Sequence, residues 1–423
     1  MTRSDLVRQE VLASGLTVVS EHMPGSKVAS VGFWVDAGSR DEDPVVAGAS
    51  HFLEHLLFKG TETRSAHEIA QAVEAVGGEM NAFTTKEYTA FYVRLLDEDL
   101  TLALDILSDI IWSPSFRPEE IDAERQVILE EINMHEDEPS DLVHELCQAA
   151  LYPGHPLGRE VLGERDTITA MARDQIRGYW AAHYRPASIV VAAAGNVDHD
   201  DLVAAVDKRF AGPEGAGPAR TATVPGPPVP VTVDRRATEQ AHLVVGMRAG
   251  ARDDDDRYAL AVLNQVLGGG MSSRLFQEVR EKRGLAYSVY SYRGAYLETG
   301  LLAIYAGTSP ARAKTVLELV NEQLDRLLQE DISERELEVA RGHVKGSVVL
   351  SLEESSSRMS RIGRARLVHG DVMTMEEMVE RTEAVTPADV RRVIENVIGG
   401  PRALAVVGPF DEDELASSPL LAG

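Results

Sequence analysis

Cysteine and long apolar runs are scarce in this chain of 423 residues. The one cysteine, Cys147, has no second cysteine to pair with, which excludes an internal disulfide and suits a reducing compartment. We expect it to be a buried apolar thiol. No apolar stretch approaches the length of a membrane-spanning helix, and residues 1–5 show no signal-peptide pattern. These absences predict a soluble, cytoplasmic protein, and the length predicts two domains.

Positive charge is also in short supply. The chain has 42 Lys and Arg residues against 68 Asp and Glu, a formal net charge of −26. An anionic surface repels phosphate groups, which argues against nucleic acid and anionic membranes as partners. Basic peptides would be attracted instead, although the same charges could serve solubility alone.

Two histidines four residues apart, His51 and His55, flank a carboxylate in an apolar segment. On a helix such residues lie one above the other, so both imidazoles can reach one tetrahedral zinc ion. Glu54 lies on nearly the same face, where it can act as a general base without ligating the metal. The pattern H-x-x-E-H is a zinc peptidase signature. The alternative is a pair of ordinary helix histidines with a solvated glutamate, but buried imidazoles and carboxylates need partners.

A catalytic zinc site needs a third protein ligand and one open position. The segment 117–139 predicts a helix, with Pro118 suited to its first turn. Glu124 and Glu131 lie one heptad apart beside its apolar stripe, where carboxylates are costly unless a positive charge meets them. We assign Glu131 as the third ligand and Glu124 as a second carboxylate that orders a ligand or water. A structural ion pair is the alternative for Glu124.

Three segments, taken together, are typical of one family; they are HFLEHLLFKGT at 51–61, GGEMNAFT at 77–84 and ERQVILEE at 124–131. They closely resemble the pitrilysin or insulinase zinc peptidases (peptidase M16, inverzincins). Within that family they are most similar to the mitochondrial processing peptidase beta subunit and its bacterial relatives, over essentially the whole chain. The resemblance implies a zinc metalloendopeptidase with one Zn²⁺ per chain, bound by His51, His55 and Glu131. It also implies catalytic roles for Glu54 and Glu124.

The chain contains an internal repeat. The Pro-, Gly- and Ala-rich segment 211–230 has the composition of a linker and separates a half at 1–210 from a half at 231–423. The segment AGSRDED at 37–43 precedes the metal motif, and AGARDDD at 249–255 precedes a comparable apolar helix. The alignment places apolar residues at the three motif positions of the second copy, namely Leu263, Val266 and Leu267. We therefore expect the first half to hold the metal and the second to keep the fold without it.

Residue periodicity predicts an α+β fold in each half. Alternating patterns predict strands at 16–21, 29–37, 89–95 and 189–194, and helical patterns predict helices at 66–76, 100–111 and 173–183. Such a series fits a mostly antiparallel or mixed sheet with helices packed on one face. The resemblance implies the same layout in two homologous halves, the LuxS/pitrilysin-like metallohydrolase fold. Asn81, Ala82 and Phe83 would begin an edge strand near the zinc, where an extended peptide substrate can add itself; an ordinary sheet edge is the alternative.

Four further site residues are assigned by the resemblance. In the family, an arginine and a tyrosine seven residues later bind substrate and stabilise the developing oxyanion, and Arg280 and Tyr287 have that spacing. From the residues alone, Arg280 is a solvated helix residue and Tyr287 a core aromatic. The processing peptidase has acidic residues at the positions of Asp141 and Glu145 to receive an arginine, which implies a basic residue near the cut. Solvated surface carboxylates are the alternative.

The resemblance also bears on assembly. Family members enclose substrate in a chamber between four such halves, whereas this chain supplies two. A homodimer is therefore expected, and a heterodimer with a related subunit is the alternative. The alternative function is a non-catalytic peptide-binding protein or a structural subunit of a heteromeric complex. The intact metal motif and Glu54 argue against both.

Overall fold

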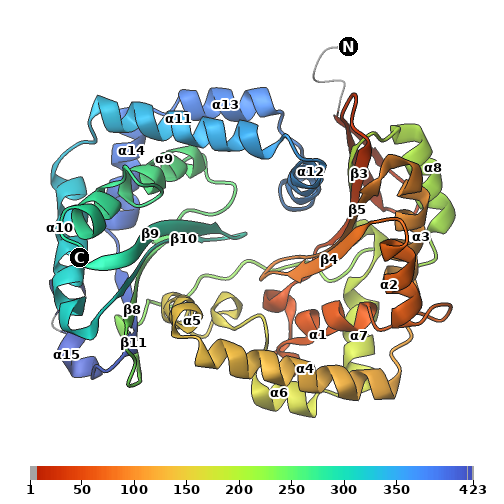
Figure 1. The fold of residues 1–423 in the computed structure, drawn as a ribbon, viewed down its shortest axis with the longest axis horizontal. Helices are drawn as coiled ribbons and strands as arrows, with labels where there is room; N and C mark the ends of the chain where they lie inside the picture. Colours follow the sequence, from red (N-terminus) through yellow and green to blue (C-terminus); the bar gives the residue numbers. More distant parts are fainter. Residues whose placement is uncertain (1–6, 417, 422–423) are drawn as a thin grey trace. The chain divides into compact units, whose positions relative to one another are not determined.

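A computed structural model describes residues 7–416 and 418–421, which form two compact units (Figure 1). Unit 1 consists of the chain up to Ile132 together with Glu160–Thr221 and Leu350–Thr374. Unit 2 consists of Asn133–Arg159, Ala222–Val349 and the chain from Met375 onward. The compact units are therefore assembled from several segments each. We propose that the division at 211–230 marks the boundary of the sequence repeat, which differs from that of the units.

A six-stranded mixed sheet forms the centre of unit 1. In spatial order its strands are β1 (Val7–Val11), β2 (Thr17–His22), β6 (Ile189–Gly195), β3 (Val28–Val35), β5 (Thr89–Leu96) and β4 (Glu79–Thr84). β2 and β6 are parallel, and all other neighbours are antiparallel. The central strands β3 and β6 are buried along nearly their whole length because both of their faces are apolar. The four predicted strands are confirmed, with bounds that differ by one or two residues.

Helices cover both faces of this sheet. One face carries the core that includes α1 (Ala49–Leu57), α2 (Ala66–Glu74), α3 (Leu100–Trp112), α4 (Pro118–Asp137), α6 (Arg165–Ala170), α7 (Arg173–His183) and α8 (His199–Arg209). The other face is covered by α12 (Ser355–His369), which lies beside β3 (Figure 1) and packs Met359 and Ile362 against Trp34. The expectation of helices on one face is therefore incomplete. Strands that are apolar on both faces need cover on both.

Unit 2 is built on the same plan. In spatial order its strands are β7 (Val231–Arg235), β11 (Arg402–Gly408), β8 (Ala241–Ala249), β10 (Gly300–Thr308) and β9 (Ala286–Ala295). Its helices are α5 (Pro139–Leu151), α9 (Arg257–Leu267), α10 (Ala313–Gln329), α11 (Glu334–Ser351), α13 (Met375–Glu383), α14 (Pro387–Val393) and α15 (Glu412–Ala416). α5 packs on the second face, where burial raises the pKa of the Cys147 thiol to about 12. The expected buried thiol is confirmed.

The two sheets repeat one topology, which confirms the two homologous halves. In each, one strand is parallel to the last strand of the unit, β2 with β6 in unit 1 and β7 with β11 in unit 2. The strand that follows it along the chain, β3 or β8, is antiparallel to the last strand and to the one before it. Unit 1 has β1 as an additional strand, antiparallel to β2. Helix α9 follows β8 as α1 follows β3, and the residues at its motif positions are buried in the core of unit 2: Leu263, Val266 and Leu267. In the described part of the chain, no helix combines the length and apolarity needed to cross a membrane.

Candidate metal centre

Helix α1 presents the H-x-x-E-H motif on the side that faces away from the core. The apolar residues of α1 are almost completely buried in unit 1; they are Phe52, Leu53, Leu56 and Leu57. His51, Glu54 and His55 are only half-buried. Helical periodicity accounts for both sides, because residues three and four apart share a face.

His51, His55 and Glu131 converge on one point. The Nε2 atoms of the two histidines are 3.2 Å apart, and Glu131 Oε2 on α4 lies 3.7 Å from the first and 3.6 Å from the second. Ligands about 2.0–2.2 Å from a tetrahedral zinc ion lie roughly 3.3–3.6 Å from one another. The three atoms therefore form a triangle of the size that zinc requires, with the nitrogen and oxygen donors that it accepts.

The electrostatics of this triangle also suit a cation. Burial and the neighbouring His55 lower the pKa of His51 to about 3, so its imidazole is neutral and has a lone pair to offer. Glu131 Oε2 is buried and has no hydrogen-bond partner among the described residues. A buried polar atom without a partner costs about 1–3 kcal/mol. A metal ion would supply the partner that Glu131 lacks.

Glu124 lies behind the triangle and orients one of its members. His55 Nδ1 donates a hydrogen bond to Glu124 Oε1 at 2.9 Å, and Lys59 Nζ lies 2.7 Å from Glu124 Oε2. Burial alone would raise the pKa of Glu124, but its hydrogen bonds with His55 and Lys59 lower it overall. A carboxylate on Nδ1 fixes the tautomer of His55 and leaves Nε2 free to ligate a metal. Glu124 therefore has contacts that fit both alternatives, with the ligand His55 and with Lys59, and its role at the site stays a prediction.

Glu54 is held by an edge strand. Thr84 Oγ1, at the end of β4, donates a hydrogen bond to Glu54 Oε2 at 2.5 Å. Burial raises the pKa of Glu54, which makes its carboxylate a stronger base. No role was predicted for Thr84 or Lys59 from the sequence, although both lie within the segments that carry the family resemblance. The polar residues of those segments were the available candidates for partners of Glu54 and Glu124.

The predicted substrate strand is an outer strand of its sheet. β4 pairs with β5 on one side and ends the strand order of unit 1. Asn81 is exposed, and Ala82 and Phe83 are half-buried. This confirms the sheet edge. That a peptide adds to it stays a prediction.

The four residues assigned by resemblance belong to unit 2. Arg280 lies in a π-helical turn, Phe276–Glu281, with its guanidinium carbon 4.7 Å from the ring centre of Tyr287. Tyr287 is 81% exposed, so the alternative of a core aromatic is wrong. Asp141 and Glu145 lie one turn apart on α5, the former exposed and the latter half-buried. The roles of these residues in the site stay predictions.

Comparison with known families decides the classification. Residues 17–165 match the model of insulinase, peptidase family M16, and residues 170–342 match that of the peptidase M16 inactive domain. The chain belongs to peptidase family M16. The M16 peptidase match covers the motif-bearing α1, and the M16 inactive-domain match covers α9, whose motif positions are apolar.

Other proteins of known sequence or structure extend this similarity to nearly the full chain. An uncharacterized zinc protease of Streptomyces coelicolor is 46% identical over 419 residues, which cover 96% of this chain and 91% of that protein. An uncharacterized zinc protease of Bacillus subtilis is 40% identical over 404 residues, which cover 96% of this chain and 98% of that protein. The crystal structure of a protease from Helicobacter pylori has a TM-score of 0.86 at 23% identity, and the match covers 95% of this chain and 99% of that chain. That last similarity concerns the fold alone.

The position of Glu124 leads to a test. We expect Glu124→Gln to weaken zinc binding by roughly 10- to 100-fold, because a neutral amide holds the His55 ring less firmly and no longer pairs with Lys59. Competition with a chromophoric chelator measures this. Glu130→Gln, an exposed position on the same helix, is the matched control and should leave the zinc affinity unchanged. Unchanged affinity in Glu124→Gln would reduce Glu124 to a structural ion pair.

Proposed function

We propose that this M16 protein is a zinc-dependent metalloendopeptidase with one Zn²⁺ per chain. The observation that carries the proposal is the triangle of His51, His55 and Glu131, with the base Glu54 on the same helix. The relatives described above, which are named zinc proteases, support it. Bound zinc would supply a Lewis acid that polarises the scissile carbonyl and lowers the pKa of water.

The chain's own residues supply the remaining chemistry. Glu54 accepts the proton of the attacking water and later delivers it to the leaving amine. Thr84 keeps the carboxylate of Glu54 in place. Arg280 and Tyr287 offer a guanidinium and a phenol to the developing oxyanion. Glu124 acts through His55, so its part in catalysis is to position a ligand.

The proposed substrates are peptides or unfolded, presequence-like polypeptides in an extended conformation. Such a segment would add to β4 at Asn81, Ala82 and Phe83 through backbone hydrogen bonds. We further propose that Asp141 and Glu145 favour a basic residue near the cut. A survey of cleavage sites tests this, and a survey without enrichment of Arg or Lys would remove the preference.

The function itself is tested by a mass-spectrometric time course with a mixed peptide library. The protein is assayed zinc-loaded, stripped by a chelator and reloaded with zinc. We expect internal cleavage in the first and third samples alone. No cleavage in any sample would favour the non-catalytic peptide-binding or structural alternative.

We also propose that two chains close a chamber around the substrate. The proposal is supported by the count of two homologous halves in the chain, half the number that encloses a substrate in the family. A homodimer would carry two complete metal motifs, whereas a heterodimer would require a related subunit. Light scattering of the purified chain at working concentration tests the homodimer, and a monomeric mass would contradict it.

A further inference from the structure

We propose that Glu42 is a positioning residue for the zinc ligand His51, an inference that rests on the proposed zinc site. Glu42 Oε2 accepts a hydrogen bond from the Gly48 amide at 2.8 Å, and Oε1 accepts one from the Ser50 amide at 2.7 Å. Its side chain is buried, with the residue only 5% exposed. Gly48 caps α1 and Ser50 is its second residue, so the carboxylate holds the turn from which His51 projects.

Charge gives Glu42 a second effect. The first turn of a helix carries unpaired amide groups and a partial positive charge equivalent to about half an elementary charge. His51 is the third residue of α1, so a cation that it binds meets this positive charge. The carboxylate of Glu42 offsets the charge and satisfies two of the amides. Because the carboxylate is buried, water screens its field only weakly.

The held turn has little room to shift. Gly48 has φ 93°, in the left-handed region that favours glycine. A Cβ atom at this position would lie 2.6 Å from Ile168 Cδ1 and 2.7 Å from the Leu162 carbonyl oxygen. On the other side, the hydroxyls of Ser50 and Tyr179 are 2.8 Å apart and hydrogen-bonded. The contacts of Glu42 therefore act on a turn that is packed from several directions.

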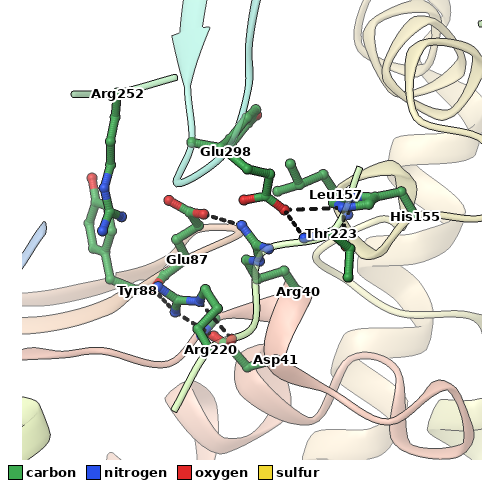
Figure 2. Close-up of polar contacts among 12 residues, drawn as sticks. Arg40, Asp41, Glu87, Tyr88, His155, Leu157, Arg220, Thr223, Arg252 and Glu298 are labelled. Carbon is green, nitrogen blue, oxygen red and sulfur yellow. Dashed lines mark hydrogen bonds and ion pairs between the residues drawn. The ribbon is translucent and has the colours of Figure 1, made fainter. Parts of the chain in front are cut away.

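Ion pairs fix the segment that carries Glu42 (Figure 2). Arg40 is buried and pairs with Glu87. Asp41 accepts hydrogen bonds from Arg220 Nε at 2.8 Å and Arg220 Nη2 at 2.6 Å, and Arg220 also donates to the Glu87 carbonyl oxygen at 2.7 Å. Arg220 lies in the predicted linker, so part of that linker is an anchor for this segment of unit 1.

The same segment is tied to the strand that holds the general base. The Ser39 amide donates to the Thr85 carbonyl oxygen at 3.1 Å. Thr85 directly follows Thr84, the partner of Glu54. The turn that carries a metal ligand and the strand end that holds the base are thus connected through residues 39–42.

The second copy of the repeat offers a comparison. Asp254 occupies the position of Glu42, and Leu263 that of His51. Asp254 also accepts a hydrogen bond at the start of its helix, from the Asp256 amide at 2.8 Å, but its side chain is exposed. The copy with metal ligands buries its carboxylate, and the copy without them exposes it. This difference is expected if Glu42 serves the metal as well as the helix.

Zinc affinity tests the proposal directly. Dissociation constants are measured for the full chain by competition with a chromophoric chelator in the wild type, E42Q, E42D and D254N. We expect E42Q to weaken zinc binding roughly 10-fold, because the amide keeps the size of the side chain but loses its charge. E42D keeps the charge and should lose less zinc affinity than E42Q. D254N should bind zinc as the wild type does, and circular dichroism of the zinc-free variants reports whether they are folded.

The possible outcomes are distinct. Wild-type zinc affinity in E42Q would overturn the role of Glu42 and leave the proposed peptidase intact. An equal loss in E42Q and D254N would also overturn it, because the loss would then reflect general destabilisation. A wild-type chain that binds no zinc would overturn the proposed function and this proposal together.

Discussion

Replacing Glu54 with glutamine should leave zinc bound and lower kcat by roughly 10²- to 10⁴-fold, the range for loss of a general base. Glu54 is not a corner of the metal triangle, so the substitution removes no ligand. Glutamine has nearly the same shape and can still accept the hydrogen bond from Thr84. It cannot accept a proton from water at neutral pH. The loss should therefore appear in kcat, with KM nearly unchanged.

The measurement combines kinetics with metal analysis. Turnover of a peptide identified in the library is followed for the wild type and Glu54→Gln, and the zinc content of each is determined by atomic absorption. Glu130→Gln controls for the removal of one carboxylate near the site. Near wild-type turnover in Glu54→Gln would show that the base is wrongly assigned. If Glu54→Gln lost both its bound zinc and its turnover, Glu54 would instead be one of the residues that hold the metal.

The part of the site that depends on one helix could be predicted from the sequence. Helix pitch alone places His51, Glu54 and His55 on one face, and the structure has them on α1. The prediction of Glu131 as a ligand required more than helix pitch, because its position depends on how α4 packs against α1. The heptad spacing from Glu124 and the family resemblance supplied that information.

The supporting contacts could not be predicted in the same way. Lys59, Thr84 and Glu42 all lie in segments that the sequence had singled out, yet each bonds to a residue on another element or beyond a turn. Polar residue types indicate that partners are needed but do not identify them. The partner depends on tertiary packing, which residue periodicity does not describe.

The fold shows the same limit. Strands with apolar faces and amphipathic helices were predicted correctly, because those patterns are local. The sequence did not indicate that α5, from the first half, belongs to unit 2, or that α12, from the second, belongs to unit 1. A helix with an apolar face must be covered, but its pattern does not say which sheet it meets.

Replacing Glu131 with glutamine should weaken zinc binding by more than the roughly 10- to 100-fold expected for a residue that acts through a ligand. The substitution removes the anionic corner of the triangle and leaves the two imidazoles with a weakly donating amide. Glu124→Gln leaves all three donors in place. A larger loss of zinc affinity in Glu131→Gln than in Glu124→Gln would therefore distinguish a ligand from a residue that orients a ligand.

Thermal unfolding distinguishes a role of Glu131 as zinc ligand from a purely structural role. Zinc that binds only the folded chain at about 1,000 times its dissociation constant stabilises it by roughly 4 kcal/mol, so Tm of the wild type should rise with zinc. Glu131→Gln should show no such rise at the same concentration, and Glu130→Gln should keep it. Without zinc, Glu131→Gln should be at least as stable as the wild type, because Glu131 Oε2 is buried there with no hydrogen-bond partner among the described residues. A zinc-dependent rise equal to that of the wild type would mean that another residue is the third ligand.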